Sequence, residues 1–417
     1  MRFDTVVVGG GLSGLACGIS LLKAGQRVAL VSAGQSTLHF HSGSFDLLGY
    51  DNEGQVVKNP LEAISRLKDG HPYTKIASTQ VAAMAEEAKQ LLAEAGIATT
   101  GDASRNHYRL SPIGAVKSTW LTIEDFVTMD DAAHFPWKRI AVANIIGYLD
   151  FPTKFLVAQL RKMGVEVDVK AFTTPELDYA RRNPSEMRAT NISRVLSDHR
   201  QIEAVASEIN EITRGYEAVL LPAVVSASDG ENASMLKQLI KIPARYVATL
   251  PPSAPGVRTE LMLKRKFYEL GGTYIINDEV VGGTIEGGRV TQVETSRLPD
   301  ERIMGKNYVL ATGSFMSHGL ISNYDEVYEP IFHLDVDAAG EHSDWTHSDV
   351  FKAQPFMEFG LATDARFHAM KGGKPIDNLF AIGSILSGHN QLKLADGTGV
   401  DLLTALQVAK TIVNKEK

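Results

Sequence analysis

Residues 1–32 read MRFDTVVVGGGLSGLACGISLLKAGQRVALVS and carry the clearest signal of the fold class. The β-branched run Phe3 to Val8 has the length of a buried strand and leads directly into Gly9-Gly10-Gly11-Leu12-Ser13-Gly14. Leu15 to Lys23 follows with apolar residues at helical spacing, and Gln26 to Val31 reads as a second strand. The order of strand, glycine turn, helix and strand predicts a βαβ unit that opens an α/β, Rossmann-like domain.

The glycine turn has the GxGxxG spacing of a phosphate-binding loop. In such a loop Gly9 permits the tight turn, Gly11 leaves room for a phosphate and Gly14 lets the helix pack closely on the strand. The amides of the helix N-terminus then face the phosphate, so we expect a flavin or nucleotide here. Ser32 stands where the second strand usually offers Asp or Glu to an adenosine ribose.

Composition narrows the class of protein. The 417 residues exceed a typical domain of ~150 residues, which predicts two or three structural units. With 44% hydrophobic and 22% charged residues, the composition is that of a globular protein. The net charge of −7 argues against nucleic acid as a binding partner. The single cysteine, Cys17, excludes an internal disulfide or a cysteine-ligated cluster and is expected to be a small buried residue. No apolar run reaches the about 18 residues of a membrane span, so any membrane association is expected to be peripheral or through a partner.

Three later segments carry further glycine-rich turns. The polar loop 36–46 contains two histidines and several hydroxyls and suits a flat polar ring. A strand, Tyr308 to Leu310, ends in a glycine turn after a hairpin over 282–295, and a strand, Leu379 to Ile382, leads through 383–399 into the helix Val400 to Val413. With the first turn, these segments predict the following cofactor-binding residues: Gly9, Gly11, Gly14, Ser32, Ser42, Gly43, Ser44, Ala311, Thr312, Gly313, Gly383, Ser384, Gly397, Thr398 and Gly399.

The chain resembles the two-dinucleotide-binding-domain flavoproteins and, within them, the family of anaerobic glycerol-3-phosphate dehydrogenase B subunits. The match lies in Met1 to Thr5 with the glycine turn, and in Leu38-His39-Phe40-His41-Ser42-Gly43-Ser44-Phe45-Asp46-Leu47-Leu48. It continues in Asn183-Pro184-Ser185-Glu186, in Thr249-Leu250-Pro251-Pro252-Ser253-Ala254-Pro255-Gly256 and in the tail from Gly383 to Gly399. The resemblance therefore covers nearly the whole chain.

This resemblance implies a flavoprotein subunit that carries FMN, with FAD as the alternative. It implies an FAD-containing A subunit and an iron–sulfur C subunit as partners, which attach the chain peripherally to the cytoplasmic face of the inner membrane. The complex would oxidise sn-glycerol 3-phosphate to dihydroxyacetone phosphate and pass electrons toward quinone in anaerobic respiration. A flavin without adenosine would make the missing acid at Ser32 less important.

The middle of the chain has no glycine motif and predicts an inserted cap or substrate domain over 96–254. It contains an expected helix, Phe155 to Lys162, and an expected strand, Val165 to Val169; Thr249 to Gly256 reads as a rigid link, followed by a helix, Arg258 to Leu270. The flavin-binding domain is expected to be discontinuous, over 1–95, 255–325 and 375–417, and the segment 326–374 joins either part.

The proposed chemistry needs cations for a phosphate and a base for a hydroxyl proton. Arg109, Lys117 and Arg258 lie near polar, glycine-bearing loops and are the predicted substrate-binding residues. His39, His41 and His389 are the predicted catalytic residues, because they lie in loops expected to face the ring. His342 and His347 lack a ligand spacing, so no metal site is predicted.

Other classes of protein stay open at this point. The chain is alternatively a non-catalytic structural or electron-relay subunit, which the serine at position 32 favours, or a stand-alone FAD oxidoreductase for another alcohol or amine. An NAD-dependent dehydrogenase is the least favoured, because it leaves the later glycine turns without a use.

Overall fold

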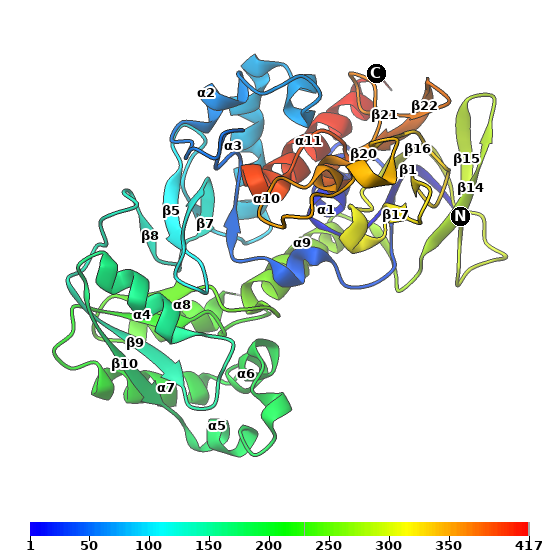
Figure 1. Ribbon diagram of the computed structural model, residues 1–417. Coiled ribbons are helices and arrows are strands. Elements are labelled where there is room, and N and C mark those ends of the chain that lie inside the picture. Colours follow the sequence, from blue (N-terminus) through cyan, green and yellow to red (C-terminus); the bar gives the residue numbers. More distant parts are fainter. Residues whose placement is uncertain (229, 416–417) are drawn as a thin grey trace. The chain divides into compact units, whose positions relative to one another are not determined.

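The computed structural model describes residues 1–228 and 230–415 (Figure 1). The chain divides into two compact units. Unit 1 comprises residues 1–37, 46–95 and 263–417, and unit 2 comprises 38–45 and 96–262. Segment 326–374 therefore lies within unit 1 and the short segment 38–45 within unit 2, while the predicted division into a flavin domain and a cap domain stays a prediction.

Unit 1 is built on a six-stranded sheet in the order β13-β2-β1-β16-β22-β21. Its first five strands are parallel, and only β21 pairs antiparallel. Val6 and Val7 of the central strand are fully buried, as expected for a parallel sheet covered on both faces. The strands are β1 (Arg2–Val8), β2 (Val28–Ser32), β13 (Thr273–Ile276), β16 (Met304–Leu310), β21 (His368–Lys371) and β22 (Lys374–Ala381).

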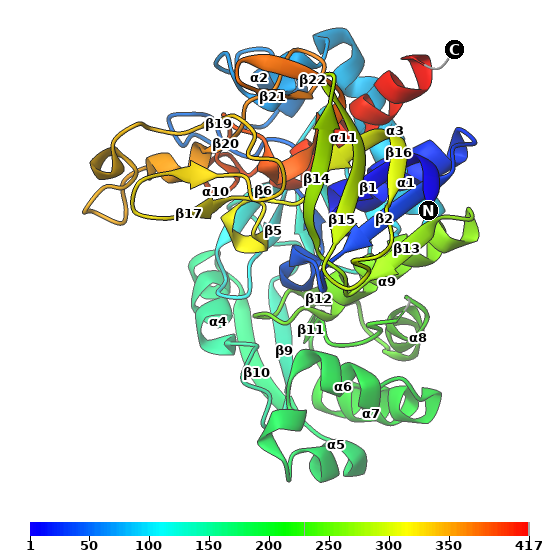
Figure 2. The same ribbon diagram turned by 90° about the vertical axis from the view of Figure 1, so that its right-hand side faces the viewer.

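Two long helices of unit 1 pack against each other, α1 (Leu12–Lys23) and α11 (Gly397–Lys415), and α3 (Ser78–Glu94) packs against α11. Cys17 is fully buried in α1, as predicted. The hairpin of β14 (Val280–Glu286) and β15 (Arg289–Thr295) is visible in Figure 2 as two long arrows. Shorter elements are α2 (Pro60–Ile64), α10 (Gln391–Leu394), β17 (Ile321–Ser322), β18 (Val327–Tyr328), β19 (Val336–Asp337), β20 (Gly360–Leu361) and the 3-10 helices η2 (Pro72–Lys75), η4 (Phe315–Ser317), η5 (His342–Asp344), η6 (Pro355–Glu358) and η7 (Gly383–Ile385).

Unit 2 contains a second, fully parallel sheet in the order β10-β9-β11-β12. Its strands are β9 (Arg139–Ile145), β10 (Glu166–Phe172), β11 (Ala218–Pro222) and β12 (Ala244–Val247). Its helices are α4 (Thr153–Lys162), α5 (Pro175–Ala180), α6 (Ala189–Val195), α7 (His199–Ile212) and α8 (Glu231–Leu239), with the 3-10 helix η3 (Pro184–Glu186).

Two small antiparallel sheets complete unit 2. One contains β3 (Ser44–Phe45), β4 (Thr99–Thr100) and β7 (Leu121–Ile123), and the other contains β5 (His107–Leu110), β6 (Val116–Thr119) and β8 (Thr128–Met129). The 3-10 helix η1 (Thr37–Phe40) precedes β3, so the predicted polar loop 36–46 is partly structured.

The observed elements confirm most of the predicted ones, including the α/β class, the first βαβ unit and the hairpin turn at 287–288. Helix α1 begins at Leu12 because its first turn lies inside the glycine motif. The predicted link Thr249 to Gly256 is wrong at its end, since α9 (Ala254–Glu269) begins two residues before that glycine. Pro255 is compatible with the first turn of a helix, where an N–H has no intrahelical acceptor.

Candidate functional site

The turn between β1 and α1 shows why its glycines are needed. Gly9 has a φ of 113°, and a side chain on it would collide with the carbonyl of Ala311, while one on Gly14 would collide with the carbonyl of Gly9. A Cβ on Gly11 would meet only Ser36, whose Cβ lies 4.0 Å away. Gly11 therefore borders open space, and no side chain caps α1 there, so its first amides are left to bind an anion.

A pocket opens at this turn, at the carboxyl end of the unit 1 sheet. It brings together the ends of β1, β2, β13 and β16, which is where ligands bind in open α/β sheets. Seven predicted cofactor residues line it: Gly9, Gly11, Ser32, Ala311, Thr312, Gly313 and Ser384. Segments nearly 400 residues apart in the chain thus meet in one site.

Five predicted cofactor residues of unit 1 do not line this pocket. Gly14 and Gly383 lie directly behind it, against Gly9 and against Ser13 with Asp401 respectively. Gly397 to Gly399 begin α11, and the Thr398 hydroxyl accepts the N–H of Asp46 at 2.6 Å. Their contacts fasten segment 46–47 to the start of α11.

Sequence reasoning missed three acidic residues that line the pocket, Asp278, Glu279 and Asp401. The first two follow β13, whose Ile276 pairs with Ser32, and the N–H of Asp278 donates to the Ser32 carbonyl at 3.1 Å. A strand pairing with β2 is a long-range feature, so only the Asp-Glu pair after the short strand run at 273–276 hinted at this position. Carboxylates therefore lie beside the place where the ribose-binding acid was missing.

Asp278 is committed to structure. Its carboxylate accepts hydrogen bonds from the Thr295 hydroxyl at 2.7 Å, the Ser296 hydroxyl at 3.2 Å and the Arg297 N–H at 2.8 Å. Burial alone raises the pKa of Asp278, but these hydrogen bonds outweigh it and the pKa is lowered. Glu279, in contrast, is exposed at the pocket.

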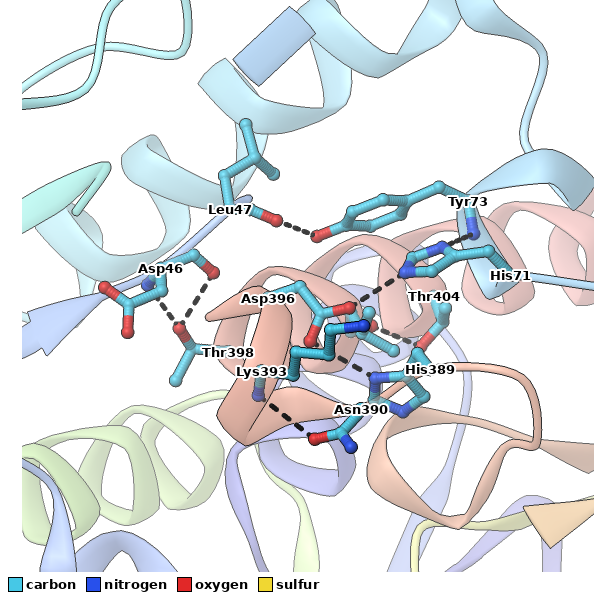
Figure 3. A network of polar contacts seen from close by, with 11 residues as sticks. Asp46, Leu47, His71, Tyr73, His389, Asn390, Lys393, Asp396, Thr398 and Thr404 are labelled. Carbon is cyan, nitrogen blue, oxygen red and sulfur yellow. Dashed lines mark hydrogen bonds and ion pairs between the residues drawn. The ribbon is translucent and has the colours of Figure 1, made fainter. Parts of the chain in front are cut away.

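A buried network surrounds Asp396, just before α11 (Figure 3). His71 Nε2 lies 2.8 Å from one oxygen of Asp396, and His389 Nδ1 lies 3.3 Å from the other. His71 Nδ1 accepts the Tyr73 N–H at 3.1 Å, so its single proton is on Nε2 and is donated to Asp396. Asp396 thus holds two histidines in fixed tautomers.

The electrostatics of this network favour an ion pair between Asp396 and His389. Burial raises the pKa of Asp396, but the charge and hydrogen bond of His389 and the hydrogen bond of His71 outweigh it and lower the pKa. Burial lowers the pKa of His389, yet the Asp396 carboxylate outweighs it, and the pKa is raised. His389 therefore carries a proton more readily than a free imidazole.

The two other predicted catalytic histidines belong to unit 2. His39 Nε2 lies 3.3 Å from the buried carboxylate of Glu260. His41 Nδ1 accepts the N–H of Gly43 at 3.2 Å, which leaves the proton on Nε2. Burial and the nearby Arg109 lower the pKa of His41 to about 4, so this ring is a neutral hydrogen-bond donor at neutral pH. Ser42 and Ser44 flank this turn, and Ser44 begins β3.

Two of the predicted substrate-binding cations are neighbours in unit 2. Arg109 of β5 pairs directly opposite Lys117 of β6, so both side chains leave the same face of that sheet. The Nε atoms of His41 and Arg109, both donors, are buried and have no hydrogen-bond partner among the residues that the structure describes. Arg258 is buried in α9. Buried donors without a partner cost free energy, so the N–H groups of His41 and Arg109 favour an oxygen-rich ligand.

The glycine turn, the parallel sheet and the pocket at its carboxyl end define an α/β protein that binds a dinucleotide or flavin. The family model described as FAD binding domain matches residues 4–400. The B subunit of anaerobic glycerol-3-phosphate dehydrogenase from Yersinia enterocolitica is 39% identical over 418 residues, covering 99% of both chains, and that from Haemophilus influenzae is 36% identical over 432 residues, covering 100% of both. The chain therefore belongs to the FAD binding domain family and, within it, to the anaerobic glycerol-3-phosphate dehydrogenase B subunits, which are flavoproteins.

Solved structures of flavoenzymes are also similar. A 3-ketosteroid Δ1-dehydrogenase of Sterolibacterium denitrificans is 11% identical with a TM-score of 0.46, covering 99% of this chain and 100% of its own. The quinol fumarate reductase FrdA of E. coli is 8% identical with a TM-score of 0.45, covering 100% of this chain and 70% of its own.

Proposed function

We propose that this chain oxidises sn-glycerol 3-phosphate to dihydroxyacetone phosphate and passes the electrons toward quinone. Membership of the B subunit family supports the substrate, and the pocket in unit 1 supports the flavin chemistry. The observation that carries the proposal is the open space at Gly11 in front of the uncapped α1 amides. We propose an FAD-containing A subunit and an iron–sulfur C subunit as partners.

We propose FAD as the cofactor. The expectation of FMN has no support from the matched family, whose description names FAD. The pocket also extends past the glycine turn to residues 31–37 and 278–280, which leaves space for the adenosine half of FAD. The fit is chemical as well, since the uncapped α1 amides suit a phosphate and the exposed carboxylate of Glu279 suits ribose hydroxyls. When bound, the flavin accepts the two electrons of the alcohol.

His389 is the residue that we propose to take the hydroxyl proton. It belongs to unit 1, and its charge interacts with that of Asp401, which lines the pocket. Asp396 accepts the Nδ1–H of neutral His389, which leaves the lone pair of Nε2 to bind a proton. The imidazolium that results is stabilised by the Asp396 carboxylate.

We propose that His41 and Arg109, with Lys117 beside them, bind oxygen atoms of the substrate phosphate. Their unpaired buried N–H groups supply donors, and a guanidinium matches the geometry of a phosphate. His41 is neutral at the pH where it would work, so we assign it a binding role and not that of a base.

Attachment to the membrane is proposed to be peripheral and through the partners, at the cytoplasmic face of the inner membrane. Within residues 1–228 and 230–415, no helix combines the length and apolar character that a bilayer crossing requires.

The test is to purify the chain, release its chromophore by denaturation and identify it by mass. Native protein is then mixed with sn-glycerol 3-phosphate without oxygen, alone and with its partners. FAD that loses its colour in the chain alone supports the proposal. FAD that loses its colour only with the partners indicates an electron-relay subunit, and a colourless protein that gains no flavin on reconstitution contradicts the proposal.

A further inference from the structure

Asp401 lies near the start of α11 and lines the pocket together with the glycine turn. Its carboxylate receives hydrogen bonds from the Ser13 hydroxyl on α1 and from the Ser384 N–H. A Cβ on Gly383 would collide with the same carboxylate and with Ser13. Asp401 is therefore held tightly by three segments at the inner wall of the pocket.

Asp401 shares its surroundings with the Asp396 network. Its charge interacts with those of Asp396 and His389, and the same two aspartates act on the buried Tyr73. His71 adds no charge, because its Nδ1 accepts the Tyr73 N–H while its other nitrogen donates to Asp396. The other titratable groups of this cluster are Asp396 with the histidine that pairs with it, the neutral His71 and Tyr73. Two further carboxylates act at its edge, Asp46 on Tyr73 and Glu358 on His389.

The charges in this cluster do not balance when both aspartates are ionised. Even when His389 is protonated and neutralises Asp396, an ionised Asp401 leaves one uncompensated negative charge beside this pair. Burial raises the pKa of Asp401 to about 7, Asp396 adds to the rise, and His389, the Ser384 N–H and Ser13 oppose it. Asp401 thus changes its charge in the neutral range, unlike an ordinary aspartate.

We propose that Asp401 is the proton-exchanging residue of the flavin pocket. This inference rests on the proposed function, because it requires a flavin in that pocket. Two electrons that enter the bound flavin with one proton would leave one negative charge on it, which a second proton would neutralise. The Asp401 O–H bond breaks to supply that proton, and the carboxylate that remains is stabilised by His389, Ser13 and the Ser384 N–H. When the two electrons leave, the proton returns to Asp401.

The experiment measures the reduction potential of the flavin in the full chain between pH 5.5 and 8.5. Below about pH 7 Asp401 supplies one of the protons, whereas above it that proton comes from solution. The potential should therefore fall more steeply above pH 7, by one further tenfold change in the equilibrium constant per pH unit, which is about 30 mV for two electrons. Asp401→Asn should lose this break, and Asp300→Asn, which changes an exposed carboxylate outside the pocket, should keep it.

A wild-type profile without the break, or an Asp401→Asn profile that keeps it, would overturn the inference. If Asp401→Asn does not fold, Ser13→Ala decides, because loss of a hydrogen bond to the carboxylate should move the break to higher pH. A wild-type chain that binds no flavin would contradict the proposed function and not this inference about Asp401. In that case Asp401 is still tested by the carbonyl stretch of a protonated carboxyl in infrared difference spectra of wild type and Asp401→Asn. A band that titrates near pH 7 and is lost in the variant supports Asp401 as a neutral-range acid. The absence of such a band contradicts it.

Discussion

A side chain on Gly9 would collide with the carbonyl oxygen of Ala311, which leaves no room for a Cβ at that position. These residues follow the adjacent parallel strands β1 and β16, whose Val8 and Leu310 are paired in register. The glycine turn after β1 and the turn at 311–313 after β16 therefore line the same pocket. The site depends on close backbone approach, which only glycine at position 9 allows.

Gly11→Val should remove the flavin without unfolding the chain. The backbone at Gly11 has φ −79° and ψ −169°, which a valine can adopt, and the space in front of it is open. The valine side chain would occupy the phosphate position, so we expect flavin content to fall at least tenfold, at a cost of about 1.4 kcal/mol or more in binding. Absorbance of the purified protein measures the flavin content. Gly340→Val is the control, since a Cβ there would meet no other described residue within 4 Å beyond its chain neighbours. Full flavin content in Gly11→Val would contradict the assignment.

Glu279→Gln should separate the two flavins. If Glu279 binds ribose hydroxyls, loss of its charge should weaken FAD by about tenfold, since a hydrogen bond to a charged group contributes about 1.5–3 kcal/mol. FMN has no adenosine ribose and should bind both proteins equally. Fluorescence quenching during titration of the flavin-free protein gives both affinities. An equal loss for FAD and FMN would count against the ribose contact.

Asp396→Asn should destabilise the fold by about 3 kcal/mol, because it removes the charged partner of two buried histidines, His71 and His389. The raised pKa of His389 contributes stability that is fully present below pH 6.5, the unfolded value, and is lost as pH rises through the folded pKa. The lowered pKa of Asp396 contributes above its unfolded value of 3.8 and does not vary between pH 6 and 9. The variant should therefore lose more stability at pH 6 than at pH 9, by urea unfolding. Asp300→Asn, at an exposed position, is the control, and an equal loss at both pH values would argue against the ion pair.

Arg109→Met should impair substrate binding and leave the flavin in place. Methionine keeps most of the side-chain volume but removes the guanidinium and its buried N–H. We expect KM for sn-glycerol 3-phosphate to rise tenfold or more, as for loss of a charged hydrogen bond, with unchanged flavin absorbance. Arg265→Met removes an exposed arginine and controls for net charge. An unchanged KM would place the phosphate elsewhere.

Local sequence patterns were enough for the elements of the first βαβ unit. The strand Phe3 to Val8, the glycine spacing and the helix that follows are short-range features, and each appears in the structure with its boundary shifted by at most a few residues. The roles of Gly9 and Gly14 in close packing were predicted correctly as well. The start of α9 was wrong because proline is compatible with both a link and a first helical turn.

The amino-acid sequence predicted a parallel α/β sheet with a glycine turn open to a phosphate, because strand length, helix spacing and glycine positions are encoded within about 30 residues. The acids of the site, in contrast, could be assigned only from long-range packing. Strand pairing brings β13 beside β2 and so places Glu279 next to Ser32, and α11 packs on α1 and so sets Asp401 against Ser13. The contact of Asp396 with His71 spans 325 residues, and that of Asp401 with Ser13 spans nearly 400, so neither leaves a periodic trace in the sequence.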